Sequence, residues 1–261
     1  MDIEGEAKAA MSAEQVTAKR VLVTGGAVRI GQAIVRAFAA AGYRVVIHYR
    51  RSEAAALALL AELGGAQAGH GAVQADLLDP DQLAGLLPAV VRSGGPLGVL
   101  VNSAAVYSRR PLAETDAQRL ADAYAINFTA PFLLMRSFAR VCRAGAIINL
   151  LDQRVAQADF RAGAYGLAKK SLRDATEAAA LEWAPRIRVN GVAPGLVLAP
   201  PAVAPEKMAA LVPNVPSQTA VAPADVAKAC VFLAEMTAVT GQILFLDGGL
   251  HLLGPNAAGE K

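Results

Sequence analysis

The chain has 261 residues, of which 54% are hydrophobic, and its formal net charge is +3 at pH 7. That composition is ample for the core of one α/β domain. Its Lys and Arg residues are scattered and are not interleaved with aromatic side chains, so we expect no nucleic-acid partner. No apolar run approaches the ~18 residues that a membrane span needs, so we expect no membrane insertion.

Residues 1–19 alternate acids, lysines and alanines without a continuous apolar stretch. They lack the apolar region of a secretory signal and predict a flexible, solvated tail, which leaves residues 20–261 as a single domain. Cys142 and Cys230 lie far apart in apolar helical contexts with no histidine cluster nearby. This spacing favours buried thiols over a disulfide or a metal site, and it suits a cytoplasmic protein without bound metal.

From residue 20 onward, short apolar runs alternate with helical patterns. Strands are expected at 20–24, 44–48, 71–75, 97–101, 146–150, 187–192 and 242–246. Helices are expected between them at 30–42, 52–63, 80–92, 116–142 and 223–234. This alternation predicts an α/β, Rossmann-type doubly wound fold, a seven-stranded parallel sheet with helices on both faces. The Pro-rich stretch 193–216 predicts a mobile substrate loop at about 195–220.

The first predicted strand leads through the glycine-rich turn TGGAVRIG into a helix. Gly25 permits the tight turn, and Gly31 lets the start of the helix press against strand and ligand. Free N–H groups at the helix N-terminus, near Ile30, attract a pyrophosphate, although a turn without a ligand is the simpler alternative. Arg29 stands where many such loops have another glycine, and it adds a cation at the phosphate and substrate end.

The ends of the second and third strands indicate which dinucleotide is bound. An NAD site usually has an acid after the second strand, whereas this chain has HYRRS, residues 48–52. Two guanidiniums and a serine suit the 2′-phosphate of NADPH, with these candidate contacts: Tyr49, Arg50, Arg51 and Ser52. The alternative is a solvated face at the start of a helix. Asp76, followed by Leu77, could accept from the adenine amino group or cap the next helix.

The fourth strand ends in VNSAAVY, residues 101–107, where small side chains follow Asn102. Asn102, Ser103 and Ala104 would allow close approach of the adenosine ribose and the nicotinamide. Tyr107 could stack on a planar substrate or could simply pack against its neighbours.

Tyr165 and Lys169 are four residues apart and so share one face of a helix. A phenol with a pKa of about 10 is a poor acid at neutral pH, and we expect the lysine cation to lower that pKa. Asn127 could complete a proton relay or satisfy a helix backbone kinked at Pro131. Asp152 ends an apolar strand, where it could pass a proton to the substrate or only cap the following loop.

These motifs, TGGAVRIG, NSAA, YGLAK, RVNGVAPG and LDGG, together with Asn127, resemble the short-chain dehydrogenase/reductase superfamily over about residues 20–250. The resemblance implies a Rossmann fold, a nicotinamide cofactor and a homotetramer built on long helices at 116–142 and 163–183. It also implies that Tyr165 protonates the substrate while Lys169 holds the nicotinamide ribose and tunes the tyrosine. Asn127 matches the relay asparagine, and Pro194 with Gly195 matches the segment against the nicotinamide.

Most members of that superfamily have a serine where this chain has Asp152. Pteridine reductases and dihydromonapterin reductases resemble the chain in the loop arginine, in the HY-x-RS strand end and in an aspartate 13 residues before the tyrosine. Ala105 and Tyr107 depart from the serine and phenylalanine often found in pteridine reductases. The expected substrate contacts are Arg29, Ala105, Tyr107, Asp152, Tyr165, Gly195 and Leu196.

The leading hypothesis is therefore an NADPH-dependent reductase of a pterin or folate-like ring, a small-molecule substrate. An alternative is an NADPH-dependent reductase of a 3-oxoacyl or other carbonyl compound, in which Asp152 only positions Tyr165. A third, from a different class, is a non-catalytic NADP-binding regulatory protein.

Overall fold

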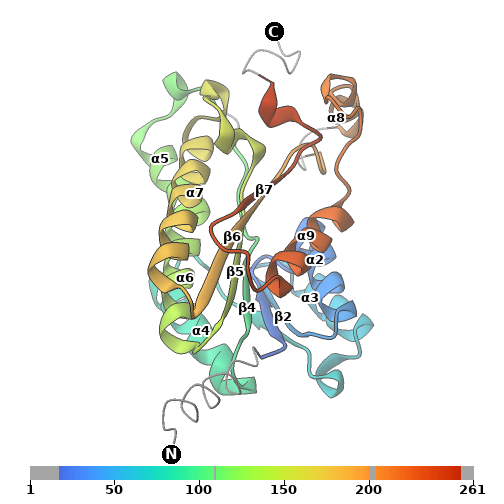
Figure 1. Ribbon diagram of the computed structural model, residues 1–261, viewed down its shortest axis with the longest axis vertical. Coiled ribbons are helices and arrows are strands. Elements are labelled where there is room, and N and C mark those ends of the chain that lie inside the picture. Colours follow the sequence, from blue (N-terminus) through green and yellow to red (C-terminus); the bar gives the residue numbers. More distant parts are fainter. Residues whose placement is uncertain (1–17, 109, 200–203, 254–261) are drawn as a thin grey trace, which may run out of the picture.

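Seven parallel strands form the centre of the computed structural model, which describes residues 18–108, 110–199 and 204–253 (Figure 1). Their order across the sheet is β3-β2-β1-β4-β5-β6-β7. The direction of winding thus reverses between β1 and β4, which confirms the predicted doubly wound sheet. The strands are β1 (Arg20–Val23), β2 (Arg44–Tyr49), β3 (Gly71–Gln74), β4 (Val99–Asn102), β5 (Gly145–Leu150), β6 (Ile187–Pro194) and β7 (Ile243–Leu246).

Helices cover both faces of the sheet (Figure 1). One apolar core lies beneath α2 (Arg29–Ala40), α3 (Glu53–Glu62) and α9 (Pro223–Glu235). The other lies beneath α4 (Pro80–Gly94), α6 (Ala130–Val141) and α7 (Gly163–Trp183). Every residue of β1, β4 and β5 is buried, as expected of central parallel strands with helices on both faces.

The predicted helix 116–142 is interrupted in its middle. It consists of α5 (Ala117–Tyr124), a π-helical turn η3 (Ala125–Thr129) and α6. Pro131 lies in the first turn of α6. It has no N–H, so it cannot donate an α-helical hydrogen bond to a carbonyl group in the preceding π-helical turn. Within the predicted substrate loop, the chain forms the short helix α8 (Pro205–Ala209), which the proline-rich sequence did not predict.

Two arginines at the amino ends of strands, one buried and one half-buried, bind the carboxyl ends of helices. Arg188, in β6, donates to the carbonyl oxygens of Leu233 and Ala234 in the last turn of α9 and of Val239 just beyond it. Arg20, in β1, donates to Val90 and Gly95 at the end of α4. A cation that satisfies the last carbonyls of a helix stabilises its negative end. These contacts fix helices on both faces to the sheet.

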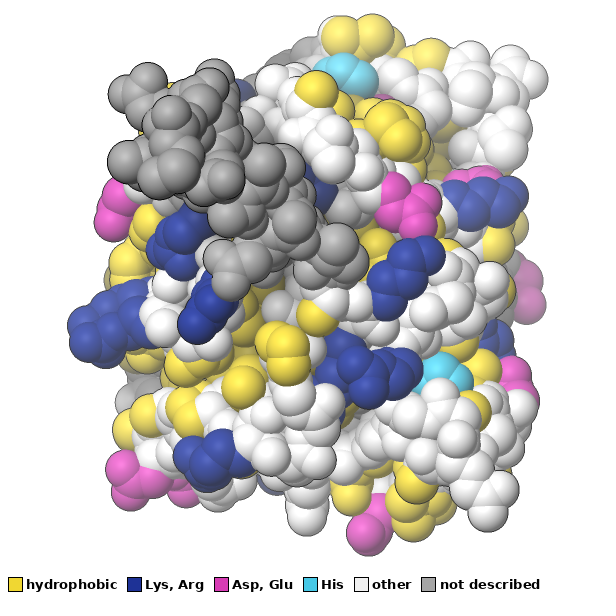
Figure 2. All heavy atoms as spheres, turned by 60° about the horizontal axis from the view of Figure 1, so that its bottom comes forward, with side chains coloured by type: hydrophobic (Ala, Val, Ile, Leu, Met, Phe, Trp, Pro, Cys, Tyr) yellow, Lys and Arg dark blue, Asp and Glu magenta, His cyan; other side chains and the backbone are white. Residues whose placement is uncertain are grey.

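The amino ends of the strands face the viewer in Figure 2. On that face, Lys and Arg side chains are interspersed with acidic and apolar ones, in keeping with the small net charge. No helix among the described residues is long and apolar enough to cross a membrane. Residues 1–17 of the predicted tail lie outside the described part of the chain.

Candidate active site

The glycine-rich loop between β1 and α2 is folded as tightly as its sequence predicts. Gly25 has a φ of +62°, and a Cβ on Gly31 would lie 2.1 Å from the Gly25 carbonyl oxygen. The N–H of Gly25 donates to Nδ1 of His48 across 3.1 Å, and Nε2 of His48 donates to the Ala75 carbonyl. Burial lowers the pKa of His48 to about 4, so the ring is neutral and ties the loop to the ends of β2 and β3. We did not predict this role from the sequence.

Arg29 joins the glycine-rich loop to the start of the predicted substrate loop. Its backbone is left-handed, with a φ of 56° that is uncommon for a residue other than glycine. Its Nη2 donates to the carbonyl oxygen of Ala199 across 2.8 Å. The cation therefore stands between the start of α2 and the segment that follows β6, at the carboxyl end of the sheet.

The candidate 2′-phosphate contacts lie at the carboxyl ends of β2 and β3. Arg50 and Asp76 face each other, with Nη1 and Oδ1 3.6 Å apart on the protein surface. Arg51 is also exposed, whereas Tyr49 and Leu77 are buried. Asp76 accepts from the N–H of Leu78 and does not cap α4, because Asp79 does so. The helix-cap alternative for Asp76 is therefore wrong.

Small residues after β4 pack directly against the glycine-rich loop. A Cβ on Gly25 would lie 3.0 Å from the Cα of Ala104. The hydroxyl of Thr24, which the sequence analysis missed, accepts from the N–H groups of Ser103 and Ala104 at 2.9 and 3.1 Å. Asn102 donates to Asn149, while its buried Oδ1 has no partner among the described residues.

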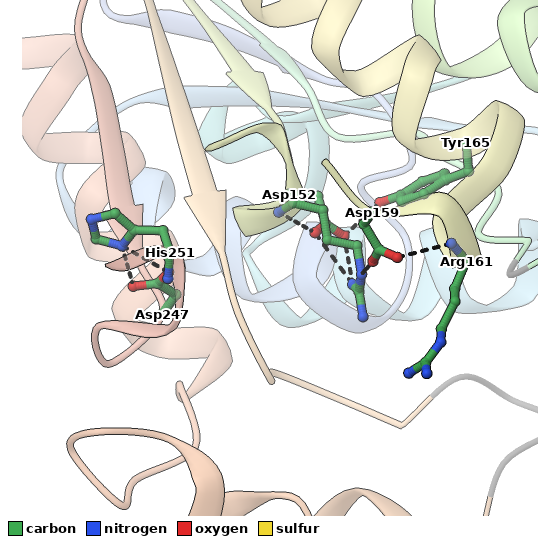
Figure 3. Close-up of polar contacts among 7 residues, drawn as sticks. Asp152, Asp159, Arg161, Tyr165, Asp247 and His251 are labelled. Atoms are coloured by element: carbon green, nitrogen blue, oxygen red, sulfur yellow. Dashed lines mark hydrogen bonds and ion pairs between the residues drawn. The ribbon is translucent and has the colours of Figure 1, made fainter. Parts of the chain in front are cut away.

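Asp152 follows β5, and its two carboxylate oxygens make separate contacts. Its Oδ1 accepts from the N–H of Arg154 at 2.9 Å and so caps the turn η4 (Gln153–Ala156). Its Oδ2 accepts from the hydroxyl of Tyr165, on α7, at 3.0 Å (Figure 3). The loop cap and the contact with the tyrosine coexist because each uses a different oxygen.

Arg154 is the cation at Asp152, and the sequence analysis did not single it out. Its Nη1 lies 3.3 and 3.4 Å from the two carboxylate oxygens of Asp152, and its Nε donates to Asp159 at 2.9 Å. Burial opposes its charge, but Asp152, Tyr107 and Asp159 outweigh that effect and raise the pKa of Arg154. The guanidinium is therefore charged, and its carbon lies 5.9 Å from the ring centre of Tyr107.

Tyr165 and Lys169 are both buried on the face of α7 that is turned toward β5. Burial, followed by the charge of Asp152, raises the pKa of Tyr165 well above 10. We expected Lys169 to lower the pKa of Tyr165, and this expectation is wrong, because burial and Asp152 raise that pKa. The Nζ of Lys169 donates to the Leu150 carbonyl at 2.7 Å, and burial lowers the pKa of this lysine to about 8.

Asn127 connects the π-helical turn to the loop after β4, in which Tyr107 also lies. Asn127 is fully buried, and its amide donates to the carbonyl oxygens of Val106 and Ala123 at 3.0 Å each. Its Oδ1 accepts from the N–H of Val106. The side chain therefore satisfies backbone groups at the interruption, as one of our two alternatives proposed. Tyr107 packs edge-on against Tyr165, with ring centres 5.0 Å apart.

The segment after β6 lies against the end of β7. The N–H of Gly195 donates to the Leu246 carbonyl, and a Cβ on Gly195 would lie 2.8 Å from the Cα of Asp247. Pro194 pairs with Leu246 in the sheet, and the Leu196 carbonyl accepts from Val221. After β7, the Nδ1 of His251 lies 2.9 Å from both carboxylate oxygens of Asp247 (Figure 3). We did not predict this pair from the sequence.

The predicted site residues thus gather at the carboxyl ends of the strands, which is the ligand side of a doubly wound sheet. No group of three or more His, Cys, Asp or Glu side chains suited to a metal ion occurs in the described part of the chain. The tight glycine-rich loop at the start of α2, with small residues packed against it after β4, suits a dinucleotide. The buried Oδ1 of Asn102 beside it has no partner in the part of the chain that the structure describes.

A family model described as enoyl-(acyl carrier protein) reductase matches residues 25–251. The chain belongs to the short-chain dehydrogenase/reductase family. It is 36% identical to galactitol 2-dehydrogenase (L-tagatose-forming) of Cereibacter sphaeroides, over 87% of this chain and 92% of the relative. It is 32% identical to pteridine reductase 1 of Leishmania tarentolae, over 90% of this chain and 97% of the relative.

Among solved structures, FolM alternative dihydrofolate reductase 1 from Brucella canis, complexed with NADP, superposes with a TM-score of 0.84. It is 33% identical in sequence, and the match covers 90% of this chain and 94% of that one. Membership of the short-chain dehydrogenase/reductase family makes the chain an oxidoreductase, which sets aside the non-catalytic alternative.

Proposed function

We propose that this short-chain dehydrogenase/reductase is an NADPH-dependent reductase of a pterin or folate-like ring. The observation that carries the proposal is the hydrogen bond from the Tyr165 hydroxyl to Asp152, a carboxylate where most of the family has a serine. The similarity to pteridine reductase 1 and to the Brucella canis FolM structure supports the same substrate class.

The cofactor would lie across the carboxyl ends of the strands. Its pyrophosphate would bind the N-terminus of α2 at Gly31, and its 2′-phosphate would bind Arg50 and Arg51. Lys169 would hold the nicotinamide ribose, and Gly195 would lie against the nicotinamide. The two arginines have exposed side chains at the carboxyl end of β2, where a bound 2′-phosphate would meet them.

The proton chemistry follows from the substrate bond that is reduced. Bound NADPH supplies the hydride. Addition of hydride to the carbon of a ring C=N leaves an electron pair on nitrogen, and that nitrogen then takes a proton. Tyr165 holds such a proton toward Oδ2 of Asp152, and the raised pKa of its phenol keeps it protonated at neutral pH. Once the proton has passed to the substrate nitrogen, Tyr165 is a phenolate beside the Asp152 carboxylate. The positive charges of Arg154 and Lys169 offset these two negative charges.

Asn127 is proposed to extend the proton path toward solvent, since its amide binds both backbone groups of Val106 beside Tyr107. Arg29 is proposed to hold the polar edge of the ring, because it stands between the glycine-rich loop and Ala199. Ala105, Tyr107 and Leu196 would form the remaining walls of the substrate site.

A second candidate is an NADPH-dependent reductase of a carbonyl compound, with Asp152 positioning Tyr165. The similarity to galactitol 2-dehydrogenase, at 36% identity, favours it. The two candidates differ in what they require of Asp152: a ketone oxygen can take its proton from the phenol alone.

A homotetramer is also proposed, in which copies meet through α5, α6 and α7. Large apolar side chains are exposed on these helices, namely Leu120, Phe132, Leu167 and Leu181. Light scattering in solution would give the molecular mass, and a monomer would contradict this assembly.

The test of the proposed function is NADPH oxidation followed by absorbance. Dihydrobiopterin, dihydrofolate, a 3-oxoacyl thioester and a quinone would be offered in parallel, with Tyr165→Phe as the control for turnover at this site. We expect the highest kcat/KM with one of the two pterin-ring substrates. Turnover of the thioester or quinone alone would contradict the proposal and favour the carbonyl reductase.

A further inference from the structure

Four side chains form a closed ring of contacts around the candidate proton donor. The Tyr165 hydroxyl binds Asp152, Asp152 pairs with Arg154, Arg154 lies over Tyr107, and Tyr107 packs edge-on against Tyr165. These residues come from three separate segments, the loop after β4, the turn after β5 and α7. Arg154 is the member of this ring that has no place in the mechanism above beyond offsetting charge.

Arg154 is held in place from more than one direction. Its own backbone N–H donates to Asp152, and its Nε donates to Asp159, which caps the next turn. Only 23% of its side chain is exposed, and the side chains of Asp152 and Asp159 are 13% and 25% exposed. A half-buried guanidinium with two carboxylate partners and an aromatic ring beside it has a fixed orientation, because each partner restricts a different part of the side chain.

We infer that Arg154 is the positioning residue that aims Oδ2 of Asp152 at the Tyr165 hydroxyl and so makes Asp152 effective in reduction of a ring C=N. Without the guanidinium, Asp152 keeps the backbone N–H of residue 154 on Oδ1 and the Tyr165 hydroxyl on Oδ2, but it loses the side chain that contacts both oxygens. The carboxylate could then rotate about its χ2 torsion and leave the tyrosine. This inference rests on the proposed function for its effect on turnover, but not for its effect on geometry.

The first test compares Arg154→Met with Arg154→Lys on a dihydropterin. Methionine keeps the length and apolar packing of the side chain and removes the charge and both donors. We expect kcat to fall at least roughly tenfold, the low end of what a positioned acid contributes, while KM changes much less. Lysine restores a cation that can reach Asp152, so Arg154→Lys should recover part of the lost kcat. The matched control is Arg161→Met, which removes the same charge from the same loop and keeps the backbone N–H that binds Asp159.

A double-variant cycle separates positioning from a general effect on the fold. If Arg154 acts through Asp152, adding Arg154→Met to Asp152→Ser should lower kcat for the pterin little further. If the fold-loss in kcat of the double variant equals the product of the two single fold-losses, the inference is overturned, because Arg154 would then act independently of Asp152. Unchanged kcat in a folded Arg154→Met protein would overturn it as well.

Two measurements do not depend on pterin turnover. Calorimetric titration with folate should give a similar Kd for wild type and Arg154→Met, since the arginine positions Asp152 and not the ring. A crystal structure of Arg154→Met should show the Tyr165 hydroxyl and Asp152 Oδ2 separated beyond the 3.0 Å of the parent. A retained bond in the variant would overturn the inference whatever the substrate. Failure of wild type to reduce any pterin, with the bond lost in the variant, would instead contradict the proposed function alone.

Discussion

The Tyr165 hydroxyl donates to one oxygen of Asp152, while the other oxygen of the same carboxylate caps the turn that follows β5. The local backbone of residues 153–156 therefore holds one oxygen of the Asp152 carboxylate, while the Arg154 side chain contacts both. A change in this turn would move the acid, even if no residue that contacts substrate were altered. The candidate site is thus built from the end of β5 and the first turn of α7, which the sheet brings together.

Replacement of Tyr165 by phenylalanine should remove most turnover and leave cofactor binding nearly intact. The phenol contributes its proton only as substrate is reduced, and a positioned acid is worth typically ~10²–10⁴-fold in rate. Steady-state kinetics and a fluorescence titration with NADPH would measure the two effects. Lys169→Ala is the contrasting variant, in which both turnover and NADPH affinity should fall. Unchanged turnover in Tyr165→Phe would show that the proton comes from elsewhere.

Replacement of both Arg50 and Arg51 by alanine should erase a preference for NADPH over NADH. Each arginine can form a charge-assisted bond to the 2′-phosphate worth about 1.5–3 kcal/mol. The NADH affinity serves as the internal control and should change little, because NADH lacks that phosphate. Equal affinity of wild type for the two cofactors would contradict the assignment of HYRRS.

Strand positions and the glycine-rich turn could be predicted because they depend on local sequence. Continuous apolar runs located all seven strands to within about two residues at either end. The sequence did not locate the interruption between α5 and α6. Pro131 is compatible with a kink in one helix and equally with the first turn of a new helix. Short α8 forms among prolines because one of them occupies its first turn.

Most of the residues that the sequence analysis missed act through long-range contacts. His48 binds Gly25 and Ala75, which are 23 and 27 residues away in the chain. The signal for it was a polar residue in an apolar strand next to the glycine-rich loop. Arg154 is two residues from Asp152, yet its role depends on Asp159 and Tyr107, whose positions only the fold determines.

His48 should make the fold sensitive to mild acid. Burial lowers its pKa from 6.5 to about 4, so the unfolded chain takes up a proton at a higher pH than the folded one. The stability that depends on neutral His48 is therefore fully present above pH 6.5 and is lost as the pH falls toward 4. As the pH falls from about 7.5 to about 5, the protonation of His48 lowers the free energy of unfolding by about 2 kcal/mol.

The measurement for His48 is the free energy of unfolding in urea at those two pH values. His48→Asn should be less stable near neutral pH, because contacts to Gly25 or Ala75 are weakened, but its stability should fall less on acidification. The same pH dependence in wild type and variant would show that other groups cause the acid sensitivity.

Removal of the guanidinium of Arg188 should destabilise the fold by at least about 2 kcal/mol. Its three part-buried hydrogen bonds go to carbonyl groups at and beyond the end of α9, and a fully buried acceptor without a donor would cost about 1–3 kcal/mol each. Arg188→Met keeps the length of the side chain, and chemical denaturation measures the loss. The control is Arg36→Met, whose ion pair with Glu62 is on the protein surface and should contribute little to stability. Equal losses in the two variants would contradict the capping role.

The decisive comparison for the substrate class is Asp152→Ser, assayed on a dihydropterin and on a simple activated ketone. Serine can still cap the turn after β5, because its hydroxyl oxygen accepts from the same backbone N–H, so the fold should be kept. It cannot replace the carboxylate that faces the Tyr165 hydroxyl.

Reduction of a ring C=N requires a proton on nitrogen, whereas a ketone places its charge on an oxygen that a serine hydroxyl and a phenol can stabilise together. We therefore expect pterin reduction by Asp152→Ser to fall at least roughly tenfold while ketone reduction is kept or improved. Thermal unfolding of both proteins would show whether the turn is intact. Equal losses on both substrates, or no pterin activity in wild type, would favour the carbonyl reductase, because Asp152 would then serve only to position Tyr165.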